Sequence, residues 1–210
     1  MKLIPQPNGM RVVFERDEAA MLDQLVSQLA QLLDSHSGTA LDPDPFFASL
    51  EVGGSDALPS DPALARLFPD AYEGTSEASE FRKVTEQGLV NRKLQDALFV
   101  TSALGVGQID DEARAQRTDD ADIESRDDAD SGAVIVEISI TTLPVWVRTL
   151  TALRLAIAAR IGLDEHDDRE RLLADEETRG TVLVFDWLAA VLESLLTVMQ
   201  SDVPSEPSHD

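Results

Sequence analysis

Arg154 is the charged residue whose position most clearly suggests a specific chemistry. It lies on the apolar stripe of a helix expected over residues 143–161. A guanidinium there costs free energy unless a carboxylate matches its planar fork. We therefore predict an ion pair with an acid from residues 61–80, with Asp70 and Glu80 as the leading choices. The alternative is that Arg154 binds the carboxylate of a ligand.

The acidic stretch near residue 130 does not match the pattern of a calcium-binding loop. Asp128 and Asp130 are followed by Gly132 one place too early for an EF-hand, and Ser139 occupies the position of the bidentate acid. The chain has no cysteine, and its three histidines form no pair at metal-ligand spacing. We therefore expect no metal site and no cofactor. The histidines are His36, His166 and His209.

The carboxylates do not indicate a catalytic site. No Gly-rich turn, Ser-x-x-Lys sequence or nucleophile elbow accompanies any of the 40 acidic residues. We therefore expect no catalytic residues and no enzymatic activity. The alternative to a non-enzymatic protein is a small-ligand-binding protein or an enzyme of unknown reaction. Its pocket would lie between the sheet and the helix over residues 144–161.

Residues 150–173 superficially resemble a helix-turn-helix. The second helix carries acids where contact with phosphates requires Arg or Lys, among them Asp164, Glu165 and Asp167. A plain helical hairpin is the favoured interpretation, and a direct DNA-binding regulator is the alternative.

The net charge of the chain limits which macromolecules it can bind. With 17 basic and 40 acidic residues, the chain carries a formal charge of −23 at pH 7. DNA phosphates and anionic lipid headgroups repel such a polyanion. The expected charged partner is the basic surface of another protein.

An early proline, Pro5, interrupts any leader, and no uninterrupted apolar run reaches about 18 residues. We therefore expect a cytoplasmic protein without a membrane span.

The predicted fold is α+β and mainly α. Asn8-Gly9 between two β-prone segments predicts an N-terminal hairpin, and the β-branched run 134–140 supplies a third strand of a small antiparallel sheet. Apolar periodicity predicts four to five helices packed with this sheet, and a brief one begins at Pro62. The main helices are expected at about 17–34, 77–104, 143–161, 164–174 and 181–200.

The aromatic residues of the two most apolar helices, Trp146 and Trp187, are structural or interaction candidates. The helix over 181–200 is apolar nearly all round, so its side chains are expected in the core or in a homodimer interface. The helix over 77–104 is expected to bury one stripe of seven residues. These are Phe81, Val84, Leu94, Ala97, Leu98, Thr101 and Leu104.

Residues 1–200 are predicted to form a single globular domain, interrupted by an acidic linker at about 108–132. The linker holds ten Asp or Glu against three Arg, with Ile109 and Ile123 as its large apolar side chains. Such a composition predicts disorder. The tail over residues 201–210 is expected to be flexible.

Three segments, 61–72, 80–86 and 150–162, together resemble an actinobacterial domain-of-unknown-function family. That family includes the oxidative-stress regulator AosR and is commonly encoded near the protease adaptor ClpS. The resemblance covers nearly the whole chain outside the acidic linker. It implies a regulatory protein that acts through protein–protein contacts in a stress response, with an extracytoplasmic-function sigma factor as a partner. Thiol redox sensing does not carry over, because the chain has no cysteine.

Overall fold

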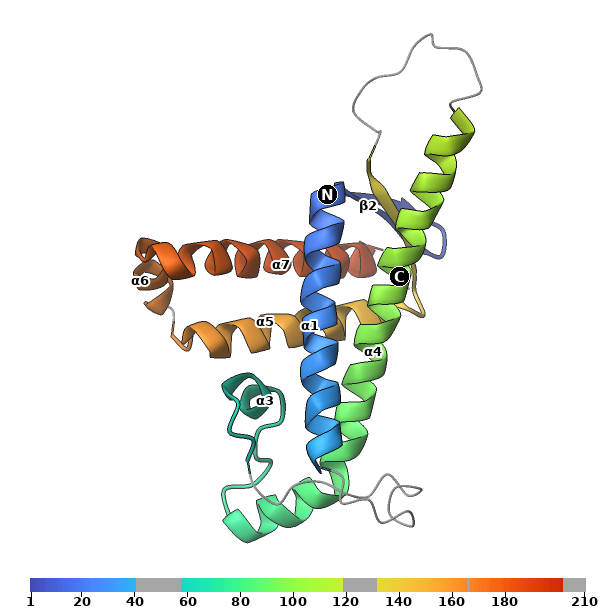
Figure 1. Cartoon of the computed structure of the whole chain (residues 1–210). Coiled ribbons are helices and arrows are strands. Elements are labelled where there is room, and N and C mark those ends of the chain that lie inside the picture. The colour runs from blue at the N-terminus through green and yellow to red at the C-terminus, as the bar shows by residue number, and fades with distance from the viewer. Residues whose placement is uncertain (41–57, 119–131, 166, 202–210) are drawn as a thin grey trace, which may run out of the picture.

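The chain forms a helical body with a small sheet at one end (Figure 1). The structure is a computed structural model and describes residues 1–40, 58–118, 132–165 and 167–201. In chain order, the elements are β1 (Lys2–Gln6), β2 (Gly9–Phe14), α1 (Arg16–Ala40), α3 (Pro62–Leu67), α4 (Thr75–Thr118), β3 (Val134–Ser139), α5 (Leu143–Ile161), α6 (Asp168–Ala174) and α7 (Glu176–Ser201). The predicted mainly helical α+β class is confirmed, with six helices in the described part of the chain.

The three strands form one antiparallel sheet in the order β1-β2-β3. Gly9 follows the hairpin turn and has a φ of 147°, a backbone angle that residues with a Cβ rarely adopt. A Cβ at this position would also overlap the carbonyl oxygen of Ile138 on β3. The predicted hairpin and the predicted third strand are therefore confirmed, and glycine is required where the turn enters the sheet.

The core lies between the sheet and the helices. α1 packs along α4, α5 packs on α7, and α4 also contacts β3 and α5. Trp146 of α5 is 1% exposed and is the largest fully buried side chain. At its end, α5 is closed by Gly162 in the left-handed conformation, and the Gly162 N–H donates to the carbonyl of Ala158. This end agrees with the predicted boundary.

α4 differs from its prediction in both orientation and length. Phe81, Val84 and Leu98 were predicted to be buried but are 41%, 61% and 53% exposed. In the first turns the buried face is rotated around the helix and includes Arg82 and Glu86, whereas Ala97 and Leu104 in the later turns are buried as predicted. The helix also continues to Thr118, into the segment predicted as an acidic linker, because Ala, Arg, Gln and Glu there are strong helix formers. Residues 119–131 lie outside the described residues, as does the tail beyond residue 201.

α7 is apolar over most of its length, as predicted. Leu188, Val191 and Leu195 are buried in the core, whereas Leu183 and Leu196 are exposed. Over residues 176–197 the helix is long and apolar enough to cross a membrane by length and composition, a test that core helices of soluble proteins also pass. Its Asp186 forms an ion pair with Arg169 of α6 at 2.6 Å.

Replacing Gly180 by alanine is expected to raise the free energy of unfolding by about 0.5–1 kcal/mol, because alanine restricts the unfolded chain and favours the helix. A Cβ at this exposed position in α7 meets no heavy atom within 4 Å. Urea denaturation measures the change. Gly9→Ala is the matched control and is expected to destabilise the protein, because its Cβ overlaps β3. A loss of stability in Gly180→Ala would contradict the prediction.

Candidate protein interaction site

A buried network of charged side chains lies where the chain leaves α3 and begins α4. Arg82 and Glu86, one helical turn apart on α4, are 5% and 3% exposed. The Arg82 guanidinium donates to Glu86 Oε2 at 2.9 Å, to Asp70 Oδ1 at 2.6 Å and to the Phe68 carbonyl at 3.1 Å. The second oxygen of Glu86, Oε1, lies 2.6 Å from Nε2 of His36 on α1. The network therefore joins α1, the segment after α3, and α4.

The network keeps Arg82 charged despite its burial. Burial alone would lower the pKa of Arg82, but hydrogen bonds and charge attraction from Asp70 and Glu86 outweigh it and raise the pKa above its ordinary value. The neighbouring Phe68 ring stacks on His36 with 5.8 Å between the ring centroids. The Nζ atom of Lys93 lies 6.0 Å from the centre of the Phe68 ring. We interpret this network as structural, because its polar groups already bind one another.

A pocket of about 240 Å³ lies over this network. We call its lining together with Tyr72 the α3–α4 corner, because the segment between α3 and α4 and the first turns of α4 supply most of it. Figure 1 shows this segment running from α3 to the start of α4. Tyr72 and Phe81 pack edge to face with 5.5 Å between centroids and remain 53% and 41% exposed. Leu89 is also exposed. The corner comprises Leu67, Phe68, Pro69, Asp70, Ala71, Tyr72, Ala78, Phe81, Arg82, Thr85, Glu86 and Leu89.

Exposed acids accompany the aromatic pair. Asp70 belongs to the corner, and Glu73, Glu77 and Glu80 are exposed on the same stretch of chain. Aromatic side chains at the centre of an interface supply much of its binding energy, and acids around them favour basic partners. Aromatic faces also attract Lys and Arg side chains directly. The arrangement is therefore suited to binding a basic protein surface.

The structure corrects the predicted partner of Arg154. Asp70 binds Arg82 instead, and Glu80 points outward on α4 as an exposed residue. The guanidinium of Arg154 lies 4.4 Å from the centre of the Phe185 ring of α7. The predicted ion pair was wrong because Asp70 binds Arg82 of α4, whereas the Arg154 side chain lies against Phe185 of α7.

The two tryptophans have different positions. Trp146 is buried in the core, so it serves packing. Trp187 of α7 is partly buried and packs against the core. Neither tryptophan belongs to the α3–α4 corner. Sequence reasoning missed Arg82 and Glu86, although their opposite charges at i and i+4 were a usable signal.

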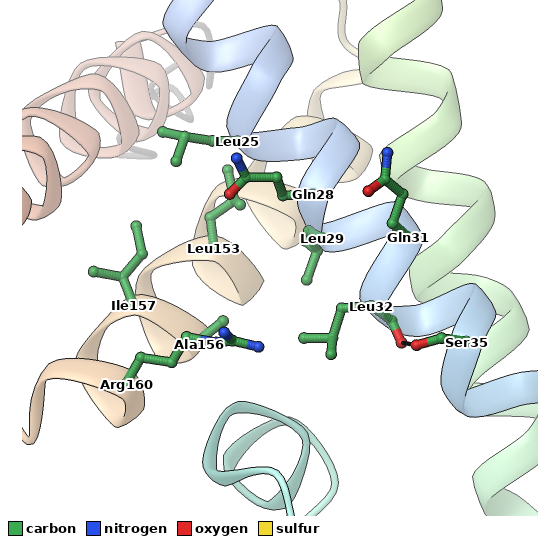
Figure 2. A pocket seen from close by; sticks show the side chains of 10 residues that line it. All are labelled: Leu25, Gln28, Leu29, Gln31, Leu32, Ser35, Leu153, Ala156, Ile157 and Arg160. Atoms are coloured by element: carbon green, nitrogen blue, oxygen red, sulfur yellow. Dashed lines mark hydrogen bonds between the residues drawn. The ribbon is translucent and has the colours of Figure 1, made fainter. Parts of the chain in front are cut away.

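A second hollow, an apolar groove of about 420 Å³, lies between α1 and α5 (Figure 2). Leu29 and Leu32 of α1 face Leu153 and Ile157 of α5 across it. Its charged residue, Arg160, already forms an ion pair with Asp61 at 3.1 Å. The groove borders α5 on the side of α1, whereas the ligand pocket considered from the sequence was expected between α5 and the sheet. Its apolar side chains are accompanied by Gln28, Gln31 and Ser35, which are not a recognisable catalytic set.

Comparison with known proteins gives a family without an assigned activity. A family model described as "Domain of unknown function (DUF2017)" matches residues 2–199. No curated protein and no solved structure matches the chain. Within the described residues, no group of three or more His, Asp or Glu side chains is arranged to hold a metal ion.

Proposed function

Because the chain belongs to the DUF2017 family of domains of unknown function, we propose its function from its own surface: it is a regulatory protein that binds a basic surface of another protein. It acts in the cytoplasm and carries out no catalysis of its own. The observation that carries the proposal is the exposed Tyr72–Phe81 pair at the α3–α4 corner, with the exposed acids Glu73, Glu77 and Glu80 on the same stretch of chain.

The partner proposed from the resemblance is an extracytoplasmic-function sigma factor in a stress response like that of AosR. Two features support this choice. The charge of −23 at pH 7 favours association with basic protein surfaces and opposes direct contact with DNA. The segments 61–72 and 80–86, which carry part of the resemblance, also form the α3–α4 corner. The trigger is not thiol oxidation, because the chain has no cysteine.

Capture from native lysate, followed by binding measurements with the purified partner, tests this function. We expect the wild-type chain to retain a sigma factor, with an affinity that falls as salt screens the acidic surface. The double variant Tyr72→Ala/Phe81→Ala is expected to bind at least about 30-fold more weakly, since a single hot-spot aromatic contributes about 2 kcal/mol or more.

Leu183→Ala is the matched control, because it removes a similarly exposed apolar side chain from α7. It is expected to leave the affinity unchanged. Equal weakening by both changes, salt-independent binding, or capture of no transcription protein would overturn the proposal. A low-salt gel shift with duplex DNA tests the DNA-binding alternative, and we expect no shift.

A further inference from the structure

A third cavity, of about 320 Å³, lies away from the α3–α4 corner, where α5 meets α6, α7 and the end of α3. Three arginines line it, Arg66, Arg154 and Arg169, against two acids, Asp164 and Glu165. Three arginines around one cavity are a local concentration of cations in a chain whose formal charge is −23 at pH 7.

Two of the three arginines are already neutralised. Arg66 lies 3.6 Å from Asp164, and Arg169 lies 2.6 Å from Asp186. Arg154 differs, because it has no ion pair or hydrogen bond with any part of the chain that the structure describes. Its Nε is fully buried without a hydrogen-bond partner.

The Phe185 ring holds the Arg154 side chain in place. The guanidinium carbon lies 4.4 Å from the ring centre, a distance typical of a cation over an aromatic face. This contact offsets part of the cost of burying the charge, but it provides no acceptor for the N–H groups of the guanidinium. Arg154 is therefore positioned beside the cavity by Phe185, and its buried Nε–H has no acceptor in the part of the chain that the structure describes.

The rest of the lining is largely apolar. Leu155 and Ala158 come from α5, Leu163 comes from the turn after α5, and Phe185 comes from α7. One positioned cation beside an apolar wall is the usual composition of a site for a small amphipathic ligand. The volume of about 320 Å³ lies at the small end of the range for such sites.

We propose that this cavity binds a small monocarboxylate with a short apolar body. The carboxylate receives two N–H groups from the guanidinium of Arg154, and the apolar body packs on Leu155, Leu163 and Phe185. Asp164 and Glu165 on the lining disfavour a doubly charged phosphate, whereas a singly charged carboxylate is tolerated beside Arg154. The site is separate from the α3–α4 corner and adds ligand binding to the proposed protein interaction.

Titration of the full chain with phenylacetate, followed by amide chemical shifts, tests the proposal. We expect saturable shifts at Leu155, Ala158 and Leu163. Phenylacetamide has the same shape without the charge. We expect it, and inorganic phosphate, to bind at least about tenfold more weakly than phenylacetate. Equal binding of the acid and the amide, or saturable shifts confined to other helices, would overturn the proposal.

Variants at Arg154 provide the second measurement. Arg154→Gln is expected to weaken phenylacetate binding about tenfold or more, and Arg154→Lys less, because a lysine retains the charge without the fork. Arg92→Gln, an exposed position on α4, makes the same change in charge and is expected to leave binding unchanged. Unaltered affinity in Arg154→Gln would refute the assignment. If that variant does not fold, the comparison of acid and amide in the wild-type chain decides.

Discussion

Glu86→Ala is expected to lower the free energy of unfolding by about 3–5 kcal/mol, the usual cost of removing one partner from a buried ion pair. Glu86 is 3% exposed and joins Arg82 of its own helix to His36 of α1. Without this carboxylate, Arg82 keeps Asp70 but loses a buried partner at 2.9 Å. The remaining charge is then insufficiently compensated, and the contact between α1 and α4 is weakened.

Urea denaturation of the variant measures this loss. Glu80→Ala is the matched control, since Glu80 is an exposed acid on the same helix, and it is expected to change stability by about 0.5 kcal/mol or less. The double variant Arg82→Met/Glu86→Leu is expected to lose less than Glu86→Ala, because it leaves no unpaired charge on α4. If Glu86→Ala cost no more than Glu80→Ala, the network would have no structural role.

Trp146→Ala is expected to cost about 3–5 kcal/mol, through lost apolar burial and the cavity that remains. The side chain is 1% exposed and belongs to the core cluster that the sheet shares with α1, α4, α5 and α7. Side chains from several elements surround it, so no single element can relax to fill the space. Thermal and urea denaturation both report the change.

Trp187→Ala is the natural comparison, because it deletes the same side chain from a partly buried position on α7. We expect a loss of about 1–2 kcal/mol, because a partly buried side chain loses less apolar burial and leaves a smaller cavity. A larger loss at Trp187 than at Trp146 would show that α7 depends on that residue more than the burial pattern indicates.

The hairpin, the third strand and most helices were predictable from local patterns. Asn8-Gly9 and the β-branched run ending at Ser139 are short-range signals, and the register that joins them follows from alternation along the strands. Gly162 marked the end of α5 for a similar reason, since glycine tolerates the left-handed conformation that closes a helix. In each case a single segment contained the information.

The buried face of α4 was not predictable in this way. Counting apolar side chains favoured Phe81 and Val84, whereas burial of Arg82 and Glu86 depends on partners supplied by α1 and the segment after α3. A polar side chain is buried only where distant elements complete its hydrogen bonds, and one segment cannot show this. The partner of Arg154 was misassigned for the same reason.

α4 is long enough to connect the α3–α4 corner with the sheet. Its first turns form the α3–α4 corner, and its later turns contact α1, α5 and β3. A protein seated on Tyr72 and Phe81 therefore restrains a helix whose opening would also expose one edge of the sheet. Backbone amide hydrogens of β3 are then expected to exchange with solvent deuterium more slowly in the complex, although no partner atom touches that strand.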